Sequence, residues 1–359
     1  MPDLIVKDIS KKYGSNQVLK NIDLHIQDGE FCVIVGPSGS GKTTLLNIIA
    51  GFIEPDSGEI IMDGKIINQL PSRDRNIGMV FQEYGLFSHM TVRKNISFGL
   101  EIKKSNKREI EKLVEEIAIK LKINGLLEKN PGTLSGGEAQ RVAIARTLIT
   151  DPLFFLFDEP LGNLDANLRT EMLTEIKRLH INLNKTFIYV THDQEQALSV
   201  ASMVIIMKDG KVLQKGHPKE VYNNPVNTFI AEFFGTQSMN LIEGILTSHD
   251  DGSIFIGEGL TVNLKGYHHL DNNKEVILGA RSEDIIIEEN NSGDGFGSVN
   301  SLEFFGDRIQ IGLSLKKEKS IILVASPKTK FDLGEKVKIK LREDKIFLFD
   351  KENGERLYS

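Results

Sequence analysis

The segment from Phe31 to Ile49 constrains the fold of this chain more than any other part of its sequence. Five apolar residues, Phe31–Val35, precede the run GPSGSGKT at Gly36–Thr43, and Lys42–Ile49 follows with helical spacing. This order matches G-x-x-x-x-G-K-[S/T] in the strand–turn–helix context that the pattern requires. The glycines let the backbone curl so that consecutive N–H groups point at one anion. The segment therefore predicts a strand, a phosphate-binding loop and a helix.

The loop residues have distinct predicted roles toward a nucleoside triphosphate. The helix that begins at Lys42 presents the positive end of its dipole to the phosphates. We expect Lys42 to reach the β- and γ-phosphates, and the Thr43 hydroxyl to ligate Mg²⁺. The alternative, a glycine-rich turn that merely joins strand to helix, leaves the terminal Lys-Thr unexplained. The residues predicted to bind ATP here are Ser38, Gly39, Ser40, Gly41, Lys42, Thr43 and Thr44.

A second apolar run ends in two adjacent acids. Leu153–Phe157 is followed directly by Asp158, Glu159 and Pro160. Ending a buried strand in two carboxylates is unfavourable unless a cation or a proton transfer uses them, although both acids could also lie at a solvated strand end. Asp158 suits a direct or water-mediated Mg²⁺ contact. Glu159 is the predicted general base for the attacking water.

The run LSGGEAQR at Leu134–Arg141, followed by the helical segment Val142–Leu148, resembles the diagnostic sequence of the ABC ATPases in the variant of ABC importers. Ser135 and the two glycines after it, Gly136 and Gly137, offer a hydroxyl and unhindered N–H groups at a helix start. The resemblance implies that they face the γ-phosphate bound by a second copy of the chain, so that the active unit is a homodimer. The Ser135–Glu138 spacing is also that of a capping box, and both roles are compatible.

The same resemblance assigns further residues. It implies that Gln82 contacts Mg²⁺ and the attacking water, that His192 contacts the γ-phosphate, and that Tyr13 stacks on adenine with Val18 beside it. Without the resemblance, Gln82 reads as a surface amide, His192 as a structural histidine and Tyr13 as a partly buried surface residue. A loop that links the two copies matches Leu161–Asp165, but Gly162 stands where the family usually has serine.

The pattern of elements predicts an α/β fold followed by a smaller β domain. Up to about Gly235, apolar strand-like runs alternate with helical patterns such as Arg108–Leu121, which favours a mainly parallel sheet. Together with this pattern, the resemblance implies a phosphate-loop ABC ATPase cassette at residues 1–235, with a helical subdomain at about 88–155. Short alternating strands after Thr236 predict a small all-β domain at residues 236–359. The resemblance implies that this domain is OB-like and regulatory.

Composition limits the class of partner and the compartment. The net charge of −6 does not favour a nucleic-acid partner. The single cysteine, Cys32, lies in an apolar run and reads as a core residue of a protein from a reducing compartment. No stretch has the roughly 18 uninterrupted apolar residues of a membrane span, and the N-terminus lacks the pattern of a secretory signal. With the resemblance, this predicts a peripheral protein on the cytoplasmic face of the cell membrane.

The resemblance also narrows the kind of transporter. The chain is similar to ATPase subunits of maltose-, polyamine-, iron- and sulfate-type importers. Their recurring G-x-R-P-E-x-I segment matches Gly279–Ile285, with serine in place of proline. The segment after Gln82 also resembles the importer version, and Ser88 again stands where proline is common. These subunits work with membrane permeases and, indirectly, a solute-binding protein. The junction Gly235–Asn240 is most similar to that of sugar importers, so we expect a carbohydrate or glycerol phosphate, with polyamine, iron or sulfate as alternatives. A soluble ABC ATPase of DNA repair would need a long inserted coiled coil, whereas only Arg108–Leu121 is clearly amphipathic in that interval.

Overall fold

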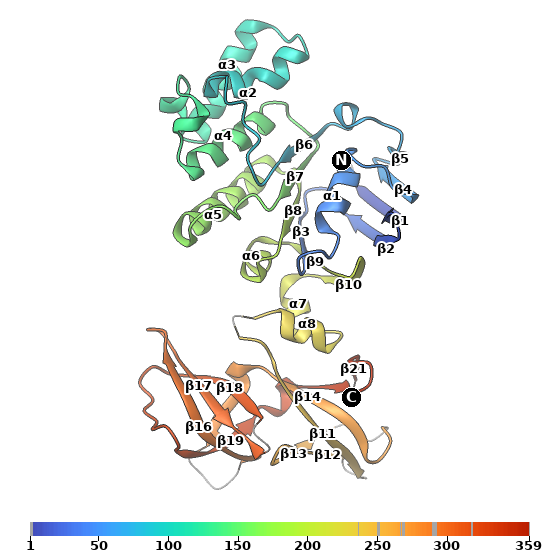
Figure 1. The fold of residues 1–359 in the computed structure, drawn as a ribbon, viewed down its shortest axis with the longest axis vertical. Helices are drawn as coiled ribbons and strands as arrows, with labels where there is room; N and C mark the ends of the chain where they lie inside the picture. Colours follow the sequence, from blue (N-terminus) through green and yellow to red (C-terminus); the bar gives the residue numbers. More distant parts are fainter. Residues whose placement is uncertain are drawn as a thin grey trace. The chain divides into compact units, whose positions relative to one another are not determined.

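The computed structural model describes residues 3–358 except 236, 250–251, 266, 268–269, 289–292 and 317–318. The chain forms two compact units, Met1–Lys219 and Glu220–Ser359, which are described separately (Figure 1). The predicted functional boundary falls later, after Gly235, and Thr236 lies outside the described residues. That boundary therefore stays a prediction.

The first unit is built on a six-stranded sheet in the order β10-β9-β3-β8-β7-β6. Its five strands from β9 to β6 are parallel, and only β10 runs antiparallel to its neighbour, as the alternation of strands and helices predicts. Parallel strands bring their carboxyl ends to one edge of a sheet, where ligands of α/β proteins bind. The strands are β3 (Phe31–Val35), β6 (Ile77–Val80), β7 (Phe154–Asp158), β8 (Thr186–Thr191), β9 (Met203–Lys208) and β10 (Lys211–Gly216).

Three helices follow the strands that end at this edge. They are α1 (Lys42–Ala50) after β3, α5 (Ala166–Leu183) after β7, and α6 (Gln194–Val200) after β8. The far end of α1 is held by the buried Arg75, which donates to the carbonyls of Ile48 and Ile49 at 2.8 and 2.9 Å. A cation at a helix C-terminus complements the helix dipole, so Arg75 fixes the helix that begins at the phosphate loop.

A second, antiparallel sheet has four strands in the order β2-β1-β4-β5. Along the chain, β1 and β2 come before β3, and β4 and β5 come between α1 and β6. The sequence analysis did not predict this sheet. Its apolar residues, such as Leu4 and Leu19, share a core cluster with Leu45 and Ile48 of α1. The pairing of β1 with β2 contains register shifts, and Asp8 has a left-handed backbone, so the hydrophobic alternation is broken. The strands are β1 (Leu4–Tyr13), β2 (Asn16–Ile26), β4 (Ser57–Met62) and β5 (Lys65–Ile66).

Between β6 and β7 the chain forms three α-helices, α2 (Val92–Ile102), α3 (Lys107–Lys120) and α4 (Gly136–Leu148), with short 3₁₀ turns. The sequence analysis recognised α3 as the one amphipathic stretch before α4 and missed α2. The inner face of α2 includes the buried polar residues Asn95 and Ser97, which obscure its apolar stripe. Among the described residues, no helix has both the length and the apolar composition that crossing a bilayer requires.

The second unit contains an antiparallel eleven-stranded sheet among its described residues, in agreement with the predicted small β domain. Its core is formed by residues such as Phe255, Leu278 and Leu348. The unit also includes α8 (Thr228–Phe233), and α7 (Pro218–Asn223) spans the division between the units. The strands are β11 (Asn240–His249), β12 (Gly252–Gly257), β13 (Leu260–Leu264), β14 (Lys274–Ala280), β15 (Ile285–Glu288), β16 (Gly295–Phe304), β17 (Ile309–Ser314), β18 (Ser320–Ala325), β19 (Lys336–Leu341), β20 (Ile346–Asp350) and β21 (Arg356–Leu357).

The motif at Gly279–Ile285 has a structural role in this second unit. The guanidinium of the buried Arg281 donates to the carbonyls of Tyr222, Ala231 and Phe234, and lies 3.8 Å from the centroid of the Tyr222 ring. Arg281 thus fastens the helical segment around α8 to the β sheet.

We expect His180 to make the stability of the first unit depend on pH. It lies in α5 with its ring centroid 5.1 Å from those of Phe31 and Phe187, and its Nε2 is 2.9 Å from the Gly29 carbonyl oxygen. Burial lowers the pKa of His180 below its ordinary value of 6.5, with the Gly29 bond acting in the opposite direction. The unfolded chain therefore binds this proton more tightly than the folded chain does.

We expect neutral His180 to make its full contribution to the free energy of unfolding above pH 6.5. This contribution is lost as the pH falls from 6.5 toward the lower pKa of His180 in the folded chain. Thermal unfolding followed across this range should show a melting temperature that falls on acidification. His180→Gln should flatten that dependence, whereas His217→Gln, at an exposed histidine, should not. An unchanged profile in His180→Gln would contradict the assignment.

Candidate functional site

The phosphate loop lies between β3 and α1, as predicted. Lys42 is buried, and its Nζ donates to the carbonyls of Gly36 and Pro37 at 2.9 Å each. Burial lowers the pKa of Lys42, with the carboxylates of Glu159 and Asp158 acting in the opposite direction. Gly41 has φ 100°, and a Cβ there would lie 2.7 Å from a Leu19 methyl carbon, so glycine is required. These contacts hold the ammonium group inside the curl of the loop.

Ser40 of the loop and Thr44 of α1 are two further residues predicted to bind ATP, and that role stays a prediction. Ser40 is buried, and its Oγ has no hydrogen-bond partner among the described residues. A buried hydroxyl without a partner is costly unless a ligand satisfies it. Thr44 is half-buried in α1, and Ser38 and Gly39 are exposed at the tip of the loop.

Thr43 and Asp158 are brought together from α1 and the end of β7. Thr43 Oγ1 donates to Asp158 Oδ1 at 2.9 Å. Burial raises the pKa of Asp158, while the bond from Thr43 acts against this rise. Both are hard oxygen donors, which Mg²⁺ prefers. No group of three His, Cys, Asp or Glu residues within the described part of the chain forms a complete metal cage. The pair therefore fits a Mg²⁺ ion that takes its other ligands from water and substrate phosphates.

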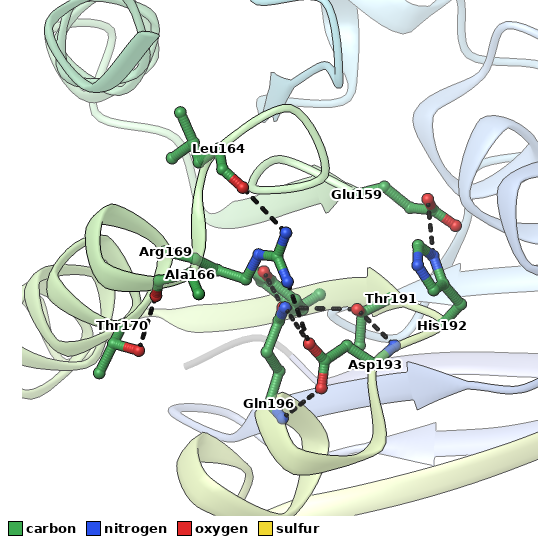
Figure 2. Close-up of polar contacts among 10 residues, drawn as sticks. Glu159, Leu164, Ala166, Arg169, Thr170, Thr191, His192, Asp193 and Gln196 are labelled. Atoms are coloured by element: carbon green, nitrogen blue, oxygen red, sulfur yellow. Dashed lines mark hydrogen bonds and ion pairs between the residues drawn. The ribbon is translucent and has the colours of Figure 1, made fainter.

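Glu159 and His192 face each other across the ends of β7 and β8 (Figure 2). His192 Nδ1 lies 3.0 Å from Glu159 Oε2, with the histidine side chain 63% exposed and the glutamate 23% exposed. Glu159 has a left-handed backbone with φ 43°, and its N–H donates to the Val190 carbonyl at 3.0 Å. Such a backbone conformation is strained for a residue with a side chain.

Gln82 follows β6 and lies beside the loop that contains Gly162. The Gln82 carbonyl accepts a hydrogen bond from Asn163 Nδ2 at 3.1 Å, and a Cβ on Gly162 would lie 3.4 Å from Gln82 Nε2. A residue with a side chain at position 162 would thus contact the Gln82 amide directly. The structure places Gln82 close to this loop, and its predicted Mg²⁺ contact stays a prediction.

Ser135, Gly136 and Gly137 form the N-terminus of α4. The predicted capping box is present, because Ser135 Oγ accepts from the Glu138 N–H at 3.3 Å and Glu138 Oε2 accepts from the Ser135 N–H at 2.8 Å. A Cβ on Gly136 or Gly137 would lie 2.9 Å from Leu164 or Leu168, respectively. Among the described residues, no hydrogen bond joins Ser135 to the phosphate loop of the same chain. Its predicted contact with the phosphate bound by a second copy stays a prediction.

The predicted adenine platform lies at the end of β1. Tyr13 is 49% exposed, and Lys11 Nζ lies 5.7 Å from the centroid of its ring. Val18, in β2, borders the phosphate loop, because a Cβ on Gly41 would lie 2.9 Å from the Val18 carbonyl oxygen. An exposed aromatic face can stack on a base, and the adenine contact of Tyr13 stays a prediction.

The sequence analysis missed two arginines that hold the loops of the site. Arg146 of α4 donates to the carbonyls of Tyr84 and Gly85 in the loop after Gln82, and its guanidinium lies 5.7 Å from the Phe87 ring centroid. Arg169 of α5 contacts Leu164 and Asp193. An arginine at a helical position carries no sign in the sequence that its partners are backbone carbonyls far along the chain.

Comparison with known proteins finds two domain families in this chain. The family model for the ABC transporter domain matches residues 19–162, and that for the TOBE domain matches residues 278–349. The chain is 41% identical over 372 residues to the oligosaccharides import ATP-binding protein MsmX of Bacillus subtilis, covering 99% of this chain and 100% of that protein. It is 39% identical over 355 residues to the sn-glycerol-3-phosphate import ATP-binding protein UgpC of Brucella abortus biovar 1, covering 97% of each chain.

A third relative comes from another class of importer. The spermidine/putrescine import ATP-binding protein PotA of Clostridium acetobutylicum is 43% identical over 317 residues, covering 88% of each chain. The three alignments cover 97%, 88% and 99% of this chain, so each extends over most of both units. The chain therefore belongs to the ABC transporter family, among the import ATP-binding subunits that carry a C-terminal TOBE domain.

Proposed function

We propose that two copies of this chain bind and hydrolyse two ATP molecules at shared sites and thereby drive solute import. The observation that carries the proposal is the meeting of two pairs at one sheet edge: Thr43 with Asp158, and Glu159 with His192. A hydroxyl–carboxylate pair beside a carboxylate–imidazole pair, next to a phosphate loop, suits metal-assisted attack of water on a phosphoryl group. Ser135 completes the site from the second copy.

The residues divide the work of positioning, proton transfer and charge stabilisation. Lys42 and the N–H groups at the start of α1 hold the β- and γ-phosphates. Glu159 orients the attacking water and accepts its proton, while His192 holds the Glu159 carboxylate and contacts the γ-phosphate. Thr43, Asp158 and Gln82 would hold Mg²⁺, which when bound neutralises charge on the phosphate oxygens.

We further propose that the dimer acts at the cytoplasmic face of the cell membrane, bound to permease subunits. A solute-binding protein delivers the solute to these permease subunits. A carbohydrate or a glycerol phosphate is the solute best supported, because the relatives from Bacillus subtilis and Brucella abortus are named for oligosaccharide and sn-glycerol-3-phosphate import. A polyamine is the second candidate, because the relative from Clostridium acetobutylicum is named for spermidine and putrescine import.

Reconstitution with a candidate permease and solute-binding protein separates these solutes. The complex is placed in liposomes, and ATP hydrolysis is measured with maltooligosaccharides, glycerol 3-phosphate or spermidine. We expect stimulation of several-fold by one of the first two and none by spermidine. Stimulation by spermidine alone would replace the carbohydrate assignment with the polyamine one. ATP hydrolysis that no permease stimulates would contradict the import function itself.

A further inference from the structure

Arg169, in the first turn of α5, joins two loops that reach the site from different strands (Figure 2). Its Nη2 donates to the Leu164 carbonyl at 2.9 Å, and its Nη1 lies 3.9 Å from Asp193 Oδ2. Leu164 belongs to the loop that follows Glu159, and Asp193 directly follows His192. The guanidinium of Arg169 therefore contacts both the segment that follows Glu159 and the residue that follows His192.

Asp193 fixes the backbone on one side of His192. Its Oδ1 accepts from the Gln196 N–H at 3.1 Å and caps α6, and its Oδ2 accepts from Gln196 Nε2 at 2.7 Å. Figure 2 shows the side chains of His192 and Asp193 pointing away from each other, toward Glu159 and toward Arg169. The position of His192 therefore depends on how Asp193 is held.

The other side of His192 is fixed by buried groups. Thr191 Oγ1 accepts from the Asp193 N–H at 3.0 Å and donates to Gln196 Oε1 at 3.4 Å. The hydroxyl of the buried Tyr189 donates to the same Gln196 oxygen at 2.8 Å. His192 itself is mostly exposed and contacts Glu159. Its orientation is thus imposed through the backbone by a network in which Arg169 is the member that reaches the Glu159 loop.

We propose that Arg169 is a positioning residue for the Glu159–His192 pair, an inference that rests on the proposed ATP hydrolysis. A cavity of about 40 Å³ is lined by Arg169, Glu159 and His192 together with Gly162 and Gln196, so the guanidinium borders the same space as the pair it positions. The Arg169–Asp193 ion pair is partly exposed, at 34% and 26%, and pairs of that kind contribute little to folding stability. Its loss should therefore appear in the rate, because a displacement of about 1 Å at a reacting group costs about 100-fold.

The test measures steady-state ATP hydrolysis by the full-length chain carrying Arg169→Ala, Arg169→Lys or Asp193→Asn. We expect Arg169→Ala to lower kcat by about 10- to 100-fold while KM for ATP changes by less than about 2-fold. Arg169→Lys should fall between Arg169→Ala and the parent, because an ammonium keeps the charge but cannot span both partners as a guanidinium does. The double variant Arg169→Ala/Asp193→Asn should have a kcat no lower than that of the slower single variant. Both substitutions remove the same contact, the Arg169–Asp193 ion pair.

Arg178→Ala is the matched control, an exposed arginine of the same helix that should leave kcat unchanged. The inference is overturned if Arg169→Ala keeps kcat within about 2-fold of the parent. It is also overturned if the fold-losses in kcat of Arg169→Ala and Asp193→Asn multiply in the double variant. It is equally overturned if melting temperature and KM change while kcat does not. Glu159→Gln in the same assay distinguishes failure of the proposed function from failure of the Arg169 inference. Normal turnover by Glu159→Gln would contradict Glu159 as the catalytic base. An inactive Glu159→Gln together with a fully active Arg169→Ala would contradict only the positioning role of Arg169.

Discussion

Replacing Glu159 by glutamine should abolish turnover while ATP stays bound. Glutamine keeps the shape of the side chain and removes the proton acceptor, and loss of a general base costs about 10²–10⁴-fold in rate. Lys42, Thr43 and Asp158 are untouched, so the groups predicted to bind the phosphates and Mg²⁺ remain. The variant should therefore accumulate as an ATP-bound dimer. Size-exclusion chromatography with ATP and Mg²⁺, alongside a phosphate-release assay, measures both effects.

Glu54→Gln is the charge-matched control for this prediction, because Glu54 is exposed outside the site. It should hydrolyse ATP at the parent rate and dissociate after turnover. A Glu159→Gln variant that still releases phosphate at the parent rate would remove Glu159 as the base. A variant that is inactive but no longer binds ATP would show that the residue acts in binding and not in proton transfer.

Replacing Ser135 by arginine should leave ATP binding by one chain intact and block hydrolysis by the pair. Ser135 lies at the start of α4 and not in the phosphate loop of its own chain, so we expect ATP binding by one chain not to depend on it. A bulky cation at this helix start would displace the hydroxyl and the N–H groups from the phosphate of the second copy. We expect turnover to fall by on the order of 100-fold, with the affinity of the isolated chain for ATP unchanged.

Loss of the helix cap must be separated from loss of the shared site. Ser135→Ala removes only the capping hydroxyl, at a cost of about 1 kcal/mol in the free energy of unfolding. Asn106→Arg performs the matching exchange at the cap of α3, outside the site. Thermal unfolding should rank these variants alike, while only Ser135→Arg loses most of its turnover. Normal hydrolysis by Ser135→Arg would contradict a site shared between two copies.

The sequence predicted those parts of the fold whose signals are local. The strand before Gly36 and the helix after Gly41 are set by a short run of apolar residues and glycines, and β3 and α1 begin where the pattern places them. The capping box at Ser135 could be predicted because its two partners are three residues apart. Parallel strands then bring Asp158 and the phosphate loop to one edge without further information.

The elements that escaped prediction depend on contacts between distant residues. β1 alternates poorly because its register shifts against β2, so only the finished sheet shows that it is a strand. The buried Asn95 of α2 looks polar in sequence, yet its amide donates to the carbonyls of Phe87, Met90 and Thr91. Arg169 is likewise an ordinary helical arginine until Asp193 is brought beside it.

The anchoring of Arg146 gives α4 a mechanical property. The helix has 13 residues, with Ser135 capping its first turn and Arg146 in its last turn holding the carbonyls of Tyr84 and Gly85. At about 1.5 Å per residue its two ends lie about 20 Å apart. Because a helix bonded along its length moves as a rod, a tilt that displaces Ser135 also displaces the loop after Gln82. In the proposed dimer we therefore expect opening of the nucleotide interface to move that loop as well, and a spin label on either end of α4 to report the same change of angle.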